Sequence, residues 1–165
     1  MNELGGQHVK ITPQGRDEIV INAPVQSVWP LIADSTLLPK WGPPVRRVEV
    51  FGSGPETVGS RRRVDAEFEG KHGYFIERRT EYLEGKRIAF VIEEDTFGLS
   101  KVMTDAGSSI DIEPIGPDRT RVEWIFFHNP KGLLGWVLNV FVIRRKQRAN
   151  RLAALAALKK YAESP

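Results

Sequence analysis

His128 and Glu77 are the two side chains of this sequence whose chemistry best fits acid–base catalysis. An unperturbed histidine titrates near pH ~6.5, and His128 stands beside Asn129-Pro130 at the end of an alternating apolar segment, where it could take a proton or donate a hydrogen bond to a ligand. No Ser, Asp or Glu is visibly paired with it, so a structural role or a place at a pocket rim is the stronger interpretation. We therefore name no catalytic residue and keep His128 and Glu77 as candidates.

Glu77 shares a strand face with Phe75 and Arg79, and alternation alone leaves open whether this face is inside or outside. On the inside, Glu77 and Arg79 would have to form a paired polar cluster, with Arg62 as a third member, because an unpaired buried charge is too costly. Such a cluster could orient a carbonyl, hydroxyl or carboxylate of a ligand. On the outside, the same residues would form a solvated ladder of charges.

The sequence favours neither a metal centre nor thiol chemistry. The chain contains no cysteine, which excludes disulfides, thiolate ligands and a cysteine nucleophile, and suits a reducing cytoplasm. Its three histidines are His8, His72 and His128, and no two of them have the i, i+4 spacing of a helical metal pair. We therefore expect no metal, no cofactor and a cytoplasmic location.

The elements that must position these residues begin with a short strand and two short helices. Glu18–Ile21 alternates as a strand, and Pro24 suits the first position of a helix. Asp34-Ser35 then ends this helix and starts a second short helical turn. The helix is predicted from apolar residues at i, i+3, i+4 and i+7, which are Val25, Val28, Trp29 and Ile32.

From Val45 to His128 the apolar residues recur at every second position instead of with the helical period. This alternation predicts a meander of about six antiparallel strands. The turns between these strands are rich in Gly, Pro and Asp, whose backbone preferences suit turns. The predicted turns are Gly52–Pro55, Gly70–Gly73, Glu84–Lys86 and Gly116–Asp118, and the last two predicted strands are Lys101–Glu113 and Thr120–His128.

After Asn129-Pro130 the pattern predicts one long helix from Leu133 to Ala162. Its expected apolar stripe is Leu134, Leu138, Phe141, Leu152 and Leu155. Its expected solvated basic face is Arg144, Arg145, Lys146, Arg148, Arg151, Lys159 and Lys160. No aromatic residues are interleaved with these charges as stacking platforms for bases, so we expect no nucleic acid as a partner.

These elements predict a single α+β domain over residues 1–165, with residues 1–15 as a loosely ordered extension. A curved antiparallel sheet of about seven strands has one apolar face to cover, and the terminal helix is the element long enough to cover it. The net charge of +3 is too small to predict an anionic partner. Residues Met1–Arg16 lack the apolar core of a secretory signal, and no apolar run reaches the ~20 residues of a membrane span.

The order and spacing of several short motifs add a resemblance that spans nearly the whole chain. The motifs are Ile19–Pro24, Val28-Trp29, Asp34, Leu38–Trp41, Val58–Ser60, Glu77–Glu81 and Arg119–Val122, followed by the long terminal helix. With them the sequence resembles the START-related polyketide cyclase/dehydrase and lipid transport superfamily (SRPBCC), whose helix-grip fold is shared with the birch pollen allergen family. The resemblance implies a hydrophobic tunnel between sheet and helix, entered near the start of that helix, and favours Glu77 on the inside.

We expect the cavity wall to be built from inward-facing strand residues and from the terminal helix. Plain core packing explains the bulky members as well as ligand contact does, because cores and cavity walls use the same residue types. We expect Trp41 near an entrance. The predicted lining is Trp29, Trp41, Val64, Phe68, Phe75, Glu77, Arg79, Phe90, Ile92, Met103, Val122, Trp124, Phe126, His128, Leu134, Leu138 and Phe141.

The leading functional hypothesis is a non-catalytic carrier that binds a small hydrophobic molecule, such as a lipid, a polyketide or an aromatic compound, in this cavity. The alternative is an aromatase/cyclase or dehydratase in which His128 or Glu77 moves a proton. A second alternative is an accessory domain that uses the apolar segment 132–143 to contact a membrane surface or a partner. For this segment a dimer contact or a mobile gate is preferred over membrane docking.

Overall fold

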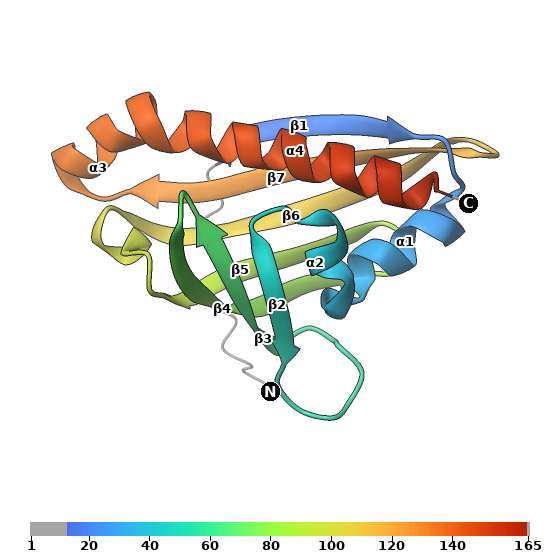
Figure 1. The fold of residues 1–165 in the computed structure, drawn as a ribbon, viewed down its shortest axis with the longest axis horizontal. Helices are drawn as coiled ribbons and strands as arrows, with labels where there is room; N and C mark the ends of the chain where they lie inside the picture. The colour runs from blue at the N-terminus through green and yellow to red at the C-terminus, as the bar shows by residue number, and fades with distance from the viewer. Residues whose placement is uncertain (1–12, 165) are drawn as a thin grey trace, which may run out of the picture.

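The computed structural model describes residues 13–164 of the chain. Seven strands form one antiparallel sheet in the order β1-β7-β6-β5-β4-β3-β2, so the first and last strands of the chain pair with each other (Figure 1). This confirms the predicted curved sheet with a long terminal helix. The strands are β1 Pro13–Ile21, β2 Val45–Val50, β3 Arg61–Phe68, β4 Lys71–Leu83, β5 Arg87–Asp95, β6 Met103–Gly116 and β7 Arg119–Pro130.

Short helices connect β1 to β2, as predicted, and a long helical rod ends the chain. The connection consists of α1 Val25–Ala33, the 3-10 turn η1 Ser35–Leu37 and α2 Leu38–Trp41. A further 3-10 turn, η2 Leu99–Lys101, precedes β6. The rod consists of α3 Gly132–Leu138, a π-helical turn η3 Asn139–Ile143 and α4 Arg144–Ala162.

Strand β1 begins earlier than predicted. Residues 13–15 of the expected N-terminal extension belong to this strand, where Pro13 and Gly15 pair with Phe127 and Phe126 of β7. The rest of that extension, including His8, lies outside the described residues. The reason for the difference is that Asp17 and Gly15 serve contacts with the terminal helix, so this part of the strand lacks the apolar alternation by which strands are recognised.

The sheet curls until both of its sides reach the terminal helix. Figure 1 shows α4 running along β1 and β7, with the β3–β4 hairpin curling towards the helix from the other side of the sheet. An ion pair spans this approach, because Lys146 Nζ lies 2.8 Å from the carboxylate of Glu69 in the β3–β4 turn. The concave face of the sheet therefore lies between the terminal helix and the β3–β4 hairpin.

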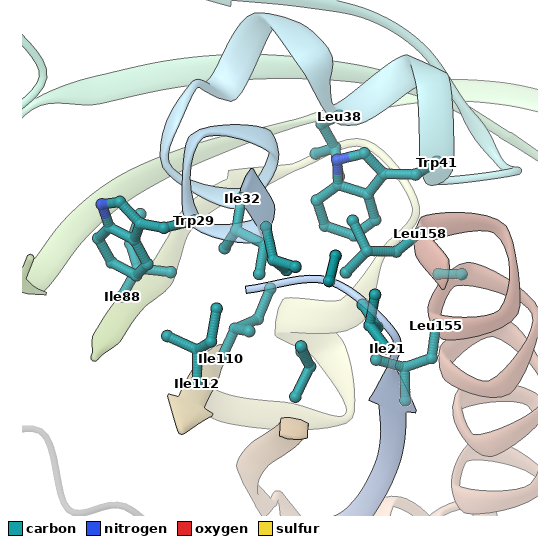
Figure 2. Close-up of a cluster of buried hydrophobic side chains, with 14 of the residues drawn as sticks. Ile21, Trp29, Ile32, Leu38, Trp41, Ile88, Ile110, Ile112, Leu155 and Leu158 are labelled. Carbon is teal, nitrogen blue, oxygen red and sulfur yellow. The ribbon is translucent and has the colours of Figure 1, made fainter. Parts of the chain in front are cut away.

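One end of this interior is solidly packed (Figure 2). Side chains from α1 and α2, from the inner face of the sheet and from the second half of α4 meet there. Val28, Val122 and Leu158 are 0% exposed. Burying one such side chain stabilises the fold by roughly 1.5–3 kcal/mol, so this end supplies much of the stability of the domain.

The expectation that Trp41 lies near an entrance is wrong, because it belongs to this packed end and is 3% exposed. Its indole N–H donates to the backbone carbonyl of Leu31 at 2.8 Å, so burial leaves no polar atom unsatisfied. Its ring meets Trp124 edge-on, with centroids 5.7 Å apart. Trp41 thus anchors α2 to the core.

The predicted apolar stripe of the terminal helix is wrong at three of its five positions. Leu134, Phe141 and Leu152 are 66%, 68% and 44% exposed, respectively. The inner side of α4 is formed instead by Arg151, Ala154, Leu155 and Leu158, all of them buried. Leu155 is the member of the predicted stripe that is fully buried.

The π-helical turn η3 explains the exposure of Leu134 and Phe141, which lie before or within it. The buried residues of α3 and η3 are Gly135 and Asn139. Asn139 precedes Arg151 by twelve positions, which in a regular α-helix leaves the two about a third of a turn out of register. A π turn takes up one additional residue, so both side chains reach the inner side of the rod. A regular helical period counted through this turn therefore selects the wrong face.

Arg151 does not belong to the solvated basic face on which it was expected. Its side chain is 6% exposed and lies 2.7 Å from the carboxylate of Asp17, which is itself 8% exposed. A Cβ at Gly15 would overlap the guanidinium of Arg151, so glycine leaves room for that group in its present position. Strand β1 therefore supplies both the carboxylate of Asp17 and, at Gly15, the space that the guanidinium of Arg151 occupies.

We expect Arg151→Met to lower the free energy of unfolding by about 3 kcal/mol, because Asp17 would remain as a buried carboxylate without its main partner. The exposed Arg145→Met on the same helix is the matched control and should change it by less than ~0.5 kcal/mol. The double variant Asp17→Asn/Arg151→Met should lose less than the sum of the single losses. Urea denaturation of Arg151→Met, Asp17→Asn, the double variant and Arg145→Met measures these losses, and strictly additive losses would contradict the pairing.

Candidate functional site

A row of neighbouring side chains crosses the inner face of the sheet from β4 to β7. Arg79 is the register partner of Phe90. Ser108 is the partner of Phe90 on its other side and of Phe126. Partners on adjacent strands point to the same face, so a guanidinium, two aromatic rings and one small hydroxyl line a path that faces the helix.

The apolar side chains of this face differ in how completely they are buried. Those at the packed end are buried, whereas others further along the interior keep partial exposure. Interior apolar side chains that are only partly buried offer contact surface that the chain itself does not cover. The partly exposed set is Phe68, Phe75, Ile92, Phe97, Trp124, Phe126 and Leu138.

Three of these aromatic rings form a cluster of their own. Phe75 and Phe97 have ring centroids 4.9 Å apart, and Phe68 meets Phe97 edge-on at 5.2 Å. Gly73 is required beside them, because a Cβ there would lie 2.7 Å from the Phe97 ring. The loop after β5 thereby folds back over the inner side of β3 and β4.

Four buried side-chain atoms of the described residues have no hydrogen-bond partner, namely Arg79 Nε, Trp124 Nε1, His128 Nδ1 and Gln147 Oε1. Trp124 and His128 stand on the inner face of β7. Gln147 precedes the buried Arg151 by four residues, so it lies on the inner side of α4. Buried polar groups are nearly always satisfied, so orphaned atoms on both layers of one interior indicate a place for a polar group from outside the chain.

Glu77 lies on the inner side, paired with Arg62. The carboxylate of Glu77 is 2.8 Å from Arg62 Nη2, and the two side chains are 15% and 10% exposed. The guanidinium of Arg62 also lies over the ring of Phe90, 3.6 Å from its centroid, and donates to Ser35 Oγ at 2.9 Å. This pair is one half of a polar cluster at the β3–β4 side of the interior.

The other half of the cluster joins Arg79 to Glu56, a residue that the sequence reasoning missed. Arg79 is 0% exposed, and its Nη2 lies 2.6 Å from the carboxylate of Glu56. Burial lowers the pKa of Arg79 from its ordinary value by disfavouring the charged form, and the charge of Glu56 counters this effect. Arg79 also donates to the backbone carbonyls of Glu56 and Ala33, at 2.9 and 3.2 Å.

These contacts fasten two connecting segments to the sheet. Glu56 belongs to the long loop between β2 and β3, and its carboxylate accepts hydrogen bonds from the N–H and the hydroxyl of Ser35 in η1. The loop and the α1–η1 corner are therefore held by the same two arginines. The cluster is a rigid wall at one side of the interior.

His128 is part of a hydrogen-bonded network at the opposite side of the interior. Gln14 Nε2 donates to the backbone carbonyl of His128, which leaves Gln14 Oε1 to accept from Asn139 Nδ2. Asn139 Oδ1 therefore faces His128 Nε2, 2.8 Å away, and the imidazole donates through Nε2. In the neutral ring, the orphaned Nδ1 is then an unused acceptor.

Burial lowers the pKa of His128 from its ordinary value. The hydrogen bond to Asn139 acts in the opposite direction, and the charge of Arg144 lowers the pKa further. The residue is 0% exposed, so the neutral ring is the form that the fold accommodates near neutral pH. Its hydrogen-bond partner is an amide, not a carboxylate that would prepare it as a strong base.

The predicted lining residues fall into three environments. Trp29, Val64, Phe90, Met103 and Val122 are buried. Trp41, Arg79 and His128 are buried as well. The predicted residues that keep partial exposure are Phe68, Phe75, Glu77, Ile92, Trp124, Phe126 and Leu138. Leu134 and Phe141 face solvent, which contradicts their expected place in the cavity wall and follows from the shift of register at η3.

The residues missed by sequence reasoning include Glu56, Asn139 and Gln147. Asn139 carried a usable signal, because it is the one polar side chain between Leu133 and Ile143. Gln147 stands among four basic residues and gave no such signal. Glu56 lies in a Gly- and Pro-containing loop, where no periodicity assigns a direction to a side chain.

Two surface hollows lie on the outer side of the sheet. One, of about 340 Å³, is lined by residues that include Arg63, Asp65 and Tyr74, and another, of about 360 Å³, by the charged residues around Arg121 and Glu123. Within both linings opposite charges pair with each other or with neighbouring residues, as on a solvated sheet surface. The described residues contain no cluster of three or more His, Cys, Asp or Glu arranged to hold a metal ion.

Comparison with known proteins now identifies the family. The family model for polyketide cyclase/dehydrase and lipid transport proteins matches residues 12–163. The chain belongs to this family. No protein with a curated description matches the chain.

Solved structures confirm the helix-grip fold. A START superfamily protein from Mycobacterium smegmatis superposes with a TM-score of 0.70 at 20% identity, over 90% of this chain and 96% of that one. The Zhui aromatase/cyclase from Streptomyces sp. R1128 gives 0.70 at 17%, over 90% and 92%. Major latex-like protein 151 from Panax ginseng gives 0.68 at 12%, over 91% and 98%. At these identities the likeness concerns the fold alone.

We expect Glu56→Gln to lower the free energy of unfolding by about 3 kcal/mol, because the fully buried Arg79 would lose its carboxylate. Glu49→Gln is the matched control. Glu49 pairs with Arg47 at the surface, where the two side chains are 51% and 69% exposed, so its loss should cost less than ~1 kcal/mol. Chemical denaturation measures both, and equal losses would contradict the assigned role of Glu56.

His128 predicts a pH dependence of stability. As the pH falls through ~6.5, the unfolded chain binds a proton at this residue before the folded chain does, because the pKa of folded His128 is lowered. The free energy of unfolding should therefore fall as the pH drops below ~7, and His128→Gln should flatten this slope. An unchanged slope in the His128 variant, measured by denaturation at each pH, would exclude this contribution.

Proposed function

We propose that this protein binds a small hydrophobic molecule between the concave face of the sheet and the terminal helix, near η3 and the first turns of α4. The observation that carries the proposal is the set of orphaned buried polar atoms on Trp124, His128 and Gln147, which lie on both layers of one interior. Partly exposed aromatic side chains on the same face supply the apolar contact. The family description, which includes lipid transport, agrees with such a guest.

The orphaned atoms restrict the chemistry of the guest. Trp124 Nε1 is a donor, whereas Gln147 Oε1 and the Nδ1 of neutral His128 are acceptors. A carbonyl can accept from Trp124, and a hydroxyl can donate to His128 or Gln147. The matching class is therefore an uncharged apolar skeleton that bears hydroxyl or carbonyl groups, held mainly by apolar burial and oriented by these few bonds.

An aromatase/cyclase or dehydratase reaction would need more than this interior offers. Such a reaction requires a group that is free to move a proton. The carboxylate of Glu77 is engaged by Arg62, and His128 Nε2 is engaged by Asn139. Acid–base chemistry would thus rest on His128 Nδ1 alone, whereas binding requires no further group.

Ser108→Phe tests the location of the guest, with 2-naphthol as a fluorescent probe that combines an apolar skeleton and a hydroxyl. Ser108 lies between Phe90 and Phe126 on the inner face, so the larger ring fills that space. We expect the affinity measured by fluorescence titration to fall at least about tenfold. Trp124→Phe keeps an aromatic ring and removes the donor, and should cost about fivefold.

Leu133→Ser is the control for this experiment, because Leu133 is 79% exposed on the outer side of α3. It should leave 2-naphthol binding unchanged. Circular dichroism would establish that Ser108→Phe is folded, and Trp124→Phe tests the same site if it is not. Binding that survives both interior changes but is lost in Leu133→Ser would place the probe on the surface and overturn the proposal.

A further inference from the structure

A large apolar surface covers the outer side of α3 and η3. The most exposed members, Leu133, Leu134 and Phe141, are 79%, 66% and 68% exposed. Surface helices of soluble domains ordinarily hide such side chains, and an exposed group of this size marks a contact site. We define the α3 patch as Leu133, Leu134, Trp136, Val137, Phe141 and Val142, each at least 39% exposed.

The α3 patch lies at one end of the molecule and continues into a basic stretch. Figure 1 shows α3 at the end of the rod that is remote from the C-terminus. Arg144, Arg145, Lys146 and Arg148 follow directly, and all four are exposed. Within residues 13–164, Arg144 and Arg145 make no ion pair, so their charge is available to a partner.

We propose that the α3 patch docks this protein onto the surface of a bilayer that contains anionic phospholipids. Leucine and phenylalanine side chains would enter the acyl boundary, and Trp136 would lie at the headgroup level, where its amphipathic ring is favoured. The neighbouring arginines would face lipid phosphates, since each basic residue close to an anionic surface adds to binding. None of the described helices has the length and apolarity to cross a membrane, so the helix would lie on the surface.

The charges favour a lipid surface over a second copy of the chain. A symmetric contact built on the α3 patch would bring two copies of the same basic stretch close to each other, and like charges at an interface oppose association. An anionic membrane presents the opposite charge to the same stretch. The partner therefore has to be apolar and negatively charged, which are the properties of an anionic bilayer.

This proposal does not depend on ligand binding. The α3 patch is on the outer side of the rod, whereas Asn139 and Gln147 mark its inner side. Leu133→Ser, which should leave 2-naphthol binding unchanged, should here reduce membrane binding. The two proposals can therefore fail separately.

Co-sedimentation with vesicles of phosphatidylcholine, with and without phosphatidylglycerol, tests the docking. We expect binding to the anionic vesicles that weakens with added salt, and much weaker binding to phosphatidylcholine alone. Leu133→Ser should lower the partition coefficient about tenfold, and Arg144→Gln/Arg145→Gln should lower it by a similar factor and reduce its salt dependence. Binding that is insensitive to phosphatidylglycerol would overturn the proposal.

Matched controls lie on either side of the turn between β6 and β7, at the end of β6 and the start of β7. Ile115 is 39% exposed and Arg119 is exposed, so Ile115→Ser and Arg119→Gln change the same residue types away from the patch. Both variants should bind anionic vesicles like the unchanged protein. Equal losses in these variants would show a general effect of charge and hydrophobicity and would contradict a specific surface.

Trp136 provides an independent readout. It is 56% exposed, whereas Trp29 and Trp41 are buried and Trp124 is partly buried. Tryptophan emission should therefore shift to shorter wavelength when anionic vesicles are added, and Trp136→Phe should abolish most of the shift. A sedimentation velocity experiment without lipid should give a monomer. A stable dimer that already shields Trp136 from acrylamide would assign the patch to a second copy and overturn membrane docking.

Discussion

The inner side of this fold depends on the pairing of buried guanidinium groups. Arg62, Arg79 and Arg151 are all buried against the sheet, where an unpaired charge would cost several kcal/mol. Each has a carboxylate from a different element, and each of these pairs fixes a distance between two parts of the chain. The loop before β3, the η1 turn and the terminal helix therefore take positions set by charge pairing as much as by apolar packing.

The consequence is a domain with two unlike halves. Around α1, α2 and the end of α4, apolar packing and the arginine cluster produce a closed, rigid structure. Around η3 and the first turns of α4, the interior keeps partly exposed aromatic side chains and orphaned polar atoms on His128 and Gln147. Binding sites need a place that the chain itself leaves incompletely satisfied, and the proposed site lies in this half for that reason.

The π-helical turn determines which side chains of the terminal rod face inwards and which face outwards. By adding a residue to one turn, it brings Asn139 to the inner side with Arg151 and turns Leu134 and Phe141 outwards. The hydrogen bond of Asn139 to His128 and the exposure of the α3 patch are therefore two results of one backbone irregularity. π turns recur at functional sites because they change the direction of side chains without ending the helix.

The spacing of apolar residues along the chain was enough to predict the curved antiparallel sheet, the short helices after β1 and the long terminal helix. Alternation and helical period report local backbone conformation, and these elements follow the local signal. The predicted lining included Trp124, Phe126 and His128 of β7. A buried cluster of Arg62, Glu77 and Arg79 was one of two alternatives that the residues left open, and the family resemblance favoured it. The carboxylates of Glu56 and Asp17 were beyond such reasoning, because each comes from a segment distant from its arginine and meets it only in the folded domain. Asn139 stood out as a polar residue in an apolar segment, but its contact with His128 depends on the π turn. The direction of Leu134 and Phe141 was likewise settled by packing, since a π turn leaves no mark in a sequence read at one fixed period.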